Sequence, residues 1–137
     1  MKILEIMTRD VQTTSPDHSL REVASLMANI DCGAILVSSQ DRLVGMVTDR
    51  DIAVRAVAQG MPCDTPVSLI MSGDIRYCYE DQDVEDVARN MADIQLRRLP
   101  VVNRDKRLVG VVSLANITRA HDHGANSTLL QGVTCTH

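Results

Sequence analysis

The sequence predicts an α+β fold built from two copies of one β-α-β-β-α unit. Residues 43–52 read LVGMVTDRDI, and residues 108–117 repeat this pattern as LVGVVSLANI. A second duplicated motif, Ile-Met followed by a hydroxyl residue, occupies residues 6–8 and 70–72. In both copies of the longer motif, a β-branched apolar run precedes a hydroxyl residue, which is typical of a strand that leads into a helix.

The composition is that of a small protein with an aliphatic core. The chain has 137 residues, of which 45% are apolar, yet it contains no Trp, no Phe and only two Tyr. Its net charge of −4 argues against nucleic acid or an anionic membrane surface as a partner. No segment is apolar over the length of a signal peptide or over the roughly 20 residues of a membrane span. The four cysteines are scattered, as expected for reduced thiols, and we expect a cytoplasmic location.

Each repeat begins with a short strand and a helix. The helix is predicted from apolar residues that recur with the i, i+3, i+4, i+7 spacing of one helical face. These residues are Leu20, Val23, Ala24, Met27 and Ile30 in the first copy, and Val84, Val87, Ala88, Met91 and Ile94 in the second. Ser19 and Glu22 match a capping box, and Asp83 is expected to cap the second helix. We interpret Met27 and Met91 as core residues.

Two strands joined by a polar turn complete each sheet. We expect short buried strands at residues 34–37 and 99–102, which places one inserted residue before the second of them. Gly45 and Gly110 lie inside the strands that follow. A glycine inside a strand indicates that another group comes close to the backbone.

A helix closes each repeat. We expect these helices at residues 49–59, where Gly60 ends the first, and at residues 114–121. The predicted organisation is repeat 1 at residues 1–60, a linker at 61–66, repeat 2 at 67–121 and a tail at 122–137.

The turn between the last strand and the closing helix is the candidate functional element. Thr48 and Ser113 are good N-caps, and unpaired N–H groups on the first helical turn would form a seat for an anion such as phosphate. Asp51 and Asn116 follow three residues later. A carboxylate at this place can accept two hydrogen bonds from a vicinal diol, as on a ribose. Helix capping and the helix dipole alone also account for these residue types.

The duplicated motifs, taken together, resemble a tandem pair of CBS domains, which are named after cystathionine β-synthase. They are Ile-Met-[Thr/Ser], the apolar helix, the Leu-Pro-Val-Val strand and the Gly-x-x-[Thr/Ser]-x-x-[Asp/Asn] turn, and they span residues 3–120. The resemblance implies two pseudo-twofold-related repeats packed sheet to sheet, with clefts that bind AMP, ADP, ATP or S-adenosylmethionine. It also implies a regulatory module that signals to a separate effector protein.

The resemblance assigns one ligand cleft to groups from both repeats. Thr48 and Asp51 would bind phosphate and ribose, and Arg98, with Arg97, would bind phosphate. Ile75 and Leu99 would enclose the base. The implied ligand-binding residues are Thr48, Asp51, Ile75, Arg76, Tyr77, Arg97, Arg98, Leu99 and Pro100.

A second, weaker cleft departs from the family pattern. The residues implied for it are Gln12, Thr13, Ala34, Ile35, Ser113 and Asn116. Asn116 replaces the carboxylate, and Cys32 and Gly33 stand where the arginines would be. A phosphate in this cleft would therefore lack a cation.

Two functional classes remain open: a sensor of an adenosine-containing ligand, and a ligand-free scaffold for dimerisation or protein interaction. No catalytic signature is present, so we expect no enzyme, no required cofactor and no metal. His121 and His123, with Cys135 and His137, could bind a metal, although a frayed helix end and tail is the simpler interpretation. The closing helix of the first repeat predicts a homodimer, because it carries the apolar residues Ile52, Ala53, Val54, Ala56 and Val57.

Overall fold

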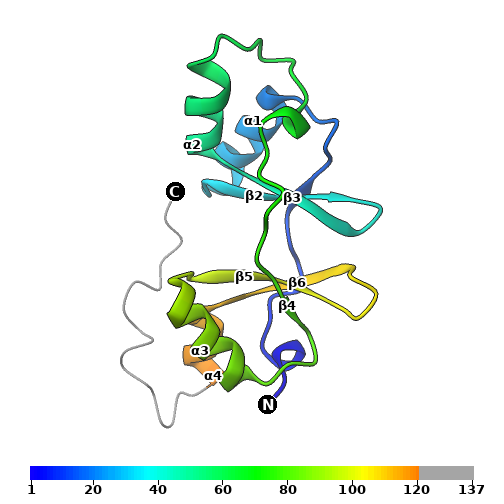
Figure 1. Cartoon of the computed structure of the whole chain (residues 1–137), viewed down its shortest axis with the longest axis vertical. Coiled ribbons are helices and arrows are strands. Elements are labelled where there is room, and N and C mark those ends of the chain that lie inside the picture. Colours follow the sequence, from blue (N-terminus) through cyan, green and yellow to red (C-terminus); the bar gives the residue numbers. More distant parts are fainter. Residues whose placement is uncertain (121–137) are drawn as a thin grey trace. The chain divides into compact units, whose positions relative to one another are not determined.

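A computed structural model describes residues 1–120 and shows two compact units of mixed α+β structure, which confirms the predicted class. The early unit comprises residues 12–75, and the late unit comprises residues 1–11 together with the described residues from 76 onward. Each unit has a three-stranded sheet with helices on one of its faces (Figure 1). A compact unit is therefore not the same set of residues as a sequence repeat.

The early unit contains the following elements: β1 (Thr13–Thr14), α1 (Leu20–Ile30), β2 (Ala34–Ser39), β3 (Arg42–Thr48), α2 (Asp49–Asp51), the π-helix η2 (Ile52–Val57) and the 3-10 helix η3 (Val67–Leu69). The late unit contains the 3-10 helix η1 (Ile3–Glu5), β4 (Cys78–Tyr79), α3 (Val84–Ile94), β5 (Arg98–Val102), β6 (Leu108–Ser113) and α4 (Leu114–Ala120). In each sheet the central strand, β2 or β5, pairs parallel with the short strand and antiparallel with the third.

The strand register corrects the predicted place of the inserted residue. Ala34 and Arg98 each pair with the hydroxyl residue at the end of the next strand, so they correspond at a spacing of 64 residues. The extra residue lies instead in the exposed hairpin turn of the late unit, at residues 103–107. A one-residue slip within the strand would turn Ile35 or Leu99 out of the core, whereas a turn tolerates the added residue.

The core of each unit consists of aliphatic and sulfur-containing side chains. The early cluster is Leu20, Val23, Met27, Ile35, Val37, Val47, Ala56, Val67 and Ile70, and the late cluster is Ile3, Met7, Cys78, Val84, Val87, Met91, Leu99, Val101, Val112 and Ile117. Met27 and Met91 are buried core residues, as predicted. Because Ile3 and Met7 pack in the late cluster, the start of the chain belongs to the late unit.

The Ile-Met segments explain the two strand glycines. A Cβ on Gly45 would lie 2.5 Å from the Met71 sulfur, and a Cβ on Gly110 would lie 2.7 Å from the Thr8 carbonyl oxygen. Ser72 and Thr8 also exchange two backbone hydrogen bonds with the adjacent strand residue. The prediction that a group approaches these glycines is confirmed, and the approaching group is the chain itself.

The helix ends match the sequence with one exception. Ser19 Oγ accepts the Glu22 N–H at 3.1 Å, and the Glu22 carboxylate accepts the Ser19 N–H at 3.2 Å, which confirms the capping box. Asp83 occupies the N-cap position of α3, as predicted, but its side chain forms no capping hydrogen bond. The Asp83 carboxylate instead lies 3.4 Å from the positively charged Met1 amino group.

The closing helices differ between the units. In the early unit, α2 continues as the π-helix η2, and Gly60 follows with φ of +74°, a conformation that glycine adopts without strain. In the late unit, α4 is α-helical up to the last described residue, Ala120. None of the helices within residues 1–120 combines the length and the apolar content of a membrane span.

Candidate functional site

Turn 48–51 joins β3 to α2 through a reciprocal pair of hydrogen bonds. The Asp51 N–H donates to Thr48 Oγ1 at 3.0 Å, and the Thr48 N–H donates to Asp51 Oδ2 at 2.9 Å. This is a capping box in which an Asp carboxylate takes the place of the more usual Glu or Gln. The structure thus brings Thr48 and Asp51 together, and their first task is to begin the helix.

The prediction of unpaired N–H groups in this turn is wrong. The Asp49 N–H donates to the Gly33 carbonyl at 2.9 Å, the Arg50 N–H donates to Asp49 Oδ1 at 2.8 Å, and the Asp51 N–H is capped by Thr48. The exposed donors at a helix start need partners, and here the protein supplies them. The groups that remain for a ligand are side chains rather than backbone amides.

Asp51 offers one open oxygen. Its side chain is 21% exposed, and Oδ1 lies 3.8 Å from Arg55 Nε, well beyond the roughly 2.7–2.9 Å of a charge-assisted hydrogen bond. An ionised carboxylate has about four lone-pair sites, and the Thr48 N–H uses one of them. A diol can therefore bind Asp51 without breaking the cap. Within residues 1–120, the Thr48 hydroxyl proton has no protein acceptor, so it too can donate to a ligand.

Turn 113–116 has the same framework but is closed. Asn116 Oδ1 accepts the Ser113 N–H at 2.9 Å and the Ser113 hydroxyl at 2.8 Å, and the Asn116 N–H donates to Ser113 Oγ at 3.1 Å. Asn116 Nδ2 lies 3.5 Å from Thr8 Oγ1, and Asn116 is only 8% exposed. The side-chain oxygen and nitrogen of Asn116 are both used inside the late unit.

The predicted residues around the start of β5 divide into two groups. The side chains of Arg97 and Arg98 are exposed, whereas Leu99 and Pro100 are buried. Leu99 is part of the late core, so only its backbone can face a ligand at the surface of this unit. In the early unit, Ile75 is partly buried.

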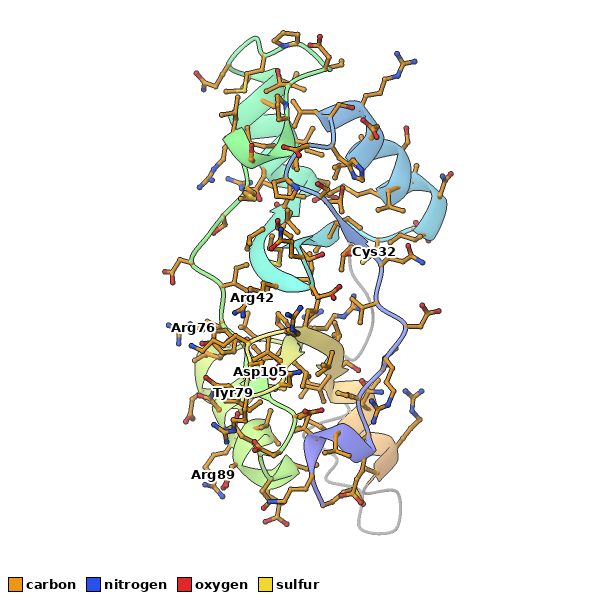
Figure 2. The ribbon with its side chains drawn as sticks, turned by 90° about the vertical axis from the view of Figure 1, so that its right-hand side faces the viewer. Cys32, Arg42, Arg76, Tyr79, Arg89 and Asp105 are labelled. Atoms are coloured by element: carbon orange, nitrogen blue, oxygen red, sulfur yellow. The ribbon has the colours of Figure 1, made fainter. Side chains whose placement is uncertain are left out.

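Tyr77 belongs to an aromatic and cationic cluster that the sequence interpretation missed. The rings of Tyr77 and Tyr79 meet edge to face, with centroids 5.7 Å apart. The Arg104 guanidinium lies 4.2 Å from the Tyr79 ring centroid and donates two hydrogen bonds to Asp81, at 2.8 and 2.9 Å. Lys106 Nζ donates to the Tyr77 hydroxyl at 3.0 Å. Tyr79 is labelled in Figure 2, as is the exposed residue Arg76, which precedes Tyr77.

The charges of this cluster shift the titration of its members. The hydrogen bond from Lys106 holds the pKa of Tyr77 below its ordinary value, and the hydrogen bonds from Arg104 do the same to the pKa of Asp81. Tyr77 directly precedes β4 and Tyr79 ends it, so the sequence already places the two rings two residues apart. The pairing with Arg104 and Lys106 depends on how the hairpin turn returns, which no local pattern encodes.

The side-chain groups implied for the second cleft are less open. Thr13 begins β1, and its Oγ1 accepts the Ser38 hydroxyl at 3.3 Å. Ile35 is buried in the early core, while Gln12 and Ala34 are exposed.

The strand register also corrects one correspondence in that cleft. Gly33 and Ala34, rather than Cys32 and Gly33, occupy the places of the two arginines. The reason is the position of the inserted residue in the hairpin turn. Neither residue carries a charge, so the expected lack of a cation at this place is unchanged.

Within residues 1–120, no three His, Cys, Asp or Glu side chains gather into a set that could hold a metal ion. His121, His123, Cys135 and His137 lie outside the described residues.

Both sequence repeats match one protein family. The CBS domain matches residues 3–57 and again residues 67–123, which covers both repeats. The chain belongs to the CBS-domain family. This CBS-domain chain is 44% identical over 115 residues to the CBS domain-containing protein YhcV of Bacillus subtilis, covering 84% of this chain and 81% of YhcV. It is 33% identical over 117 residues to Hypoxic response protein 1 of Mycobacterium tuberculosis, covering 84% of this chain and 81% of the relative.

Solved structures of CBS-domain proteins have the same fold. The crystal structure of Hypoxic Response Protein I with two coordinated zinc ions matches with a TM-score of 0.76 and 31% identity, over 88% of this chain and 98% of that one. The CBS domain pair of protein MJ0100, in complex with 5'-methylthioadenosine and S-adenosyl-L-methionine, matches with a TM-score of 0.71 and 26% identity. The latter match covers 90% of this chain and 98% of that one. The chain is thus similar to a CBS pair that binds adenosine-containing ligands.

Proposed function

We propose that this CBS-domain protein is a regulatory module, without catalytic activity, that binds AMP, ADP, ATP or S-adenosylmethionine through turn 48–51. The observation that carries the proposal is Asp51, a partly exposed carboxylate with one open oxygen beside a hydroxyl that can still donate. A ribose diol supplies two hydroxyl donors, and the remaining lone pairs of the Asp51 carboxylate can accept both of them. The similarity to the ligand-bound MJ0100 pair supports the choice of an adenosine compound.

The other residues that the resemblance implies would contribute to ligand binding, and mutagenesis can test each of them. Arg97 and Arg98 are exposed residues, and a guanidinium group is suited to binding phosphate. The family resemblance also implies Ile75, Arg76, Tyr77, Leu99 and Pro100 as ligand-binding residues, and each is a candidate for mutagenesis. Since Asn116 is occupied within its own unit, we expect one tight ligand per chain, and occupancy would be passed to a separate effector protein.

The test compares Asp51→Ala with Asp49→Ala in isothermal calorimetry and thermal shift. Asp51→Ala removes the acceptor of two hydrogen bonds, each worth roughly 1.5–3 kcal/mol when charge-assisted. Affinity for the best adenosine compound should fall at least tenfold, and the ligand-induced rise in Tm should disappear. Asp49→Ala removes the same charge from the same turn and should bind like the parent protein. Unchanged affinity of Asp51→Ala would show that the ligand binds elsewhere.

The late turn is the second control. Asn116→Ala should retain the ligand-induced rise, measured against its own melting temperature without ligand. Calorimetry that finds two equally tight sites per chain would contradict the assignment of a single open turn.

The alternative function, a dimerisation scaffold, has its own supporting observation. On the closing helix of the early unit, Val54 is 47% exposed and Val57 is 69% exposed, and Leu69 on η3 is also exposed. Arg55 donates to the Ile70 carbonyl, which ties this helix to the segment that carries Leu69. Such an exposed apolar face favours a homodimer.

Light scattering tests the dimer. The parent protein should have twice the monomer mass at micromolar concentration, and Val57→Glu should reduce the mass to that of a monomer. Leu96→Glu changes an exposed apolar residue of the late unit and should leave the dimer intact. If Asp51→Ala loses the ligand but stays dimeric, ligand binding and scaffolding are separate properties. A monomeric parent protein would rule out the dimer.

A further inference from the structure

Arg55 links the open carboxylate to a distant part of the early unit. It follows Asp51 by four residues, and its Nε lies 3.8 Å from Asp51 Oδ1. Its Nη1 donates to the Ile70 carbonyl oxygen at 3.2 Å. One guanidinium therefore spans turn 48–51 and the start of the second Ile-Met segment.

The two contacts of Arg55 differ in strength. The Ile70 contact has the length of a hydrogen bond, whereas the Asp51 contact is a longer ionic one. Because Oδ2 is held by the Thr48 N–H, a ligand hydroxyl is expected to take Oδ1, the oxygen that faces Arg55. A hydroxyl bound at Oδ1 therefore shares this oxygen with Arg55 and weakens the longer of the two Arg55 contacts.

Ile70 begins the segment that leaves the early unit. Ile70 is buried, Met71 lies against Gly45, and Ser72 exchanges backbone hydrogen bonds of 2.8 and 2.9 Å with Met46 on β3. The early unit ends three residues after Ser72, at Ile75. A change in the hydrogen bond between Arg55 and the Ile70 carbonyl therefore acts on the segment through which the chain leaves the early unit.

The internal repeat supports a specific role for this arginine. Asn116 lies 65 positions after Asp51, and Ala120 lies 65 positions after Arg55. The late unit therefore lacks both the carboxylate and the guanidinium at these two equivalent positions. There, the Asn116 side chain reaches the Ile-Met segment directly, through Thr8 Oγ1 at 3.5 Å. Both turns are thus connected to their Ile-Met segments, directly in the late unit and through Arg55 in the early one.

We propose that Arg55 is a positioning residue that couples occupancy of Asp51 to the segment at residues 70–72. A hydroxyl bound to Asp51 Oδ1 weakens the ionic contact of this oxygen with Arg55, and the guanidinium then changes its hydrogen bond to Ile70. The inference rests on the proposed function, since it requires a ligand at Asp51. It adds the route by which binding alters the end of the unit.

The test is a ¹H–¹⁵N NMR titration of the full chain with AMP and, separately, with S-adenosylmethionine. The Asp51 amide reports the turn, the Ser72 amide reports the exit segment, and the Arg55 Nε–H signal reports the guanidinium. In the parent protein all three signals should shift with the same midpoint. In Arg55→Ala the Asp51 amide should still shift, while the Ser72 shift should fall at least threefold.

Two variants make the result specific. Arg50→Ala removes the same charge from an exposed position of the same helix and should preserve the Ser72 response. Arg55→Lys keeps the charge but has no planar fork that spans two acceptors, so it should not restore the Ser72 response. This variant also carries the test if Arg55→Ala fails to fold.

The outcomes separate this inference from the proposed function. A full Ser72 shift in Arg55→Ala or Arg55→Lys, or a parent protein whose Asp51 amide shifts without Ser72, would overturn the coupling and leave ligand binding intact. If neither compound shifts the Asp51 amide of the parent protein, the proposed function is wrong, and the coupling falls with it.

Discussion

Turns 48–51 and 113–116 have one backbone framework and opposite availability. In both, a hydroxyl residue and the residue three positions later cap the helix reciprocally. The Asp51 side chain retains an open oxygen, while Asn116 is buried and spends both polar atoms on its own unit. The exchange of carboxylate for amide, together with the contacts around each cap, therefore separates a candidate ligand site from a structural cap.

This difference shows that a repeated motif need not repeat a function. The demand for capping is the same in both units, so it preserves the residue spacing. What a ligand encounters depends on the contacts that surround the cap. The late turn indicates that the late unit is the more tightly closed of the two, and matched changes in both units can test this.

The largest expected difference concerns Cys78, which occupies the place in β4 that Thr14 occupies in β1. Burial raises the pKa of the Cys78 thiol to about 12. Against an ordinary value near 8.5, this lowers the thiolate fraction at about pH 8 on the order of a thousandfold. Alkylation followed by mass spectrometry should find Cys78 at least that much slower than the exposed Cys63.

The alkylation experiment uses a Cys32→Ser, Cys135→Ser background, so that only two thiols report. In urea the two rates should converge, because the unfolded chain no longer buries Cys78. Fast labelling of Cys78 under native conditions would show that the late unit opens readily, contrary to the comparison.

The strand glycines provide the next test. At Gly110 an added Cβ would meet the Thr8 backbone carbonyl, which cannot move without the segment, whereas at Gly45 it would first meet the flexible Met71 side chain. We expect Gly110→Ala to lower the free energy of unfolding by about 2–3 kcal/mol, and Gly45→Ala by about 1 kcal/mol. Urea denaturation measures both. Equal losses of unfolding free energy would show that the two Ile-Met segments shift equally easily to make room for the added Cβ.

The turns themselves should differ in stability cost. Asn116→Ala leaves the Ser113 N–H and hydroxyl without their acceptor in a buried place, at a cost of about 1–3 kcal/mol. Asp51→Ala removes a favourable charge at a helix start and the acceptor of one hydrogen bond, from the part-buried Thr48 N–H, at a cost of about 0.5–1.5 kcal/mol. Thermal unfolding without ligand should therefore rank Asn116→Ala as the less stable variant. The reverse order would mean that Asp51 is the structural residue.

The smallest expected effect lies in the tyrosine cluster, which has no counterpart in the early unit because the chain has only two tyrosines. Lys106→Met removes the hydrogen bond that lowers the pKa of Tyr77, so this pKa should rise towards its ordinary value. Ultraviolet titration measures it, since the chain has no Trp. Lys2→Met serves as a control, and an unchanged Tyr77 titration in Lys106→Met would rule out the contact.

The sign of the linked stability follows from the lowered pKa. Because the folded state favours the Tyr77 phenolate, the contribution is complete only above the pKa of an unfolded tyrosine and is lost as the pH falls through the folded pKa. Lys106→Met should therefore match the parent protein in stability at neutral pH and fall below it only in alkali.

The sequence by itself determined the features that depend on neighbours within a few residues. The apolar spacing specified both long helices, the Ser19 and Glu22 pair specified a capping box, and the paired motifs specified the duplicated strand-turn-helix. These features are local because a helix or a turn forms from hydrogen bonds between residues close in the chain. The placement of Thr48 beside Asp51 was predictable for the same reason.

Only the tertiary structure decided the features that depend on residues far apart in the chain. The place of the inserted residue followed from strand register, and the pairing of the Asp49 N–H followed from the Gly33 carbonyl oxygen. Arg55 lies too far from Asp51 Oδ1 for a hydrogen bond, so this oxygen keeps room for a ligand, whereas Thr8 pairs with Asn116 Nδ2. The sequence alone shows neither distance. Local patterns supply the donors and acceptors, but packing decides which of them are already paired before a ligand arrives.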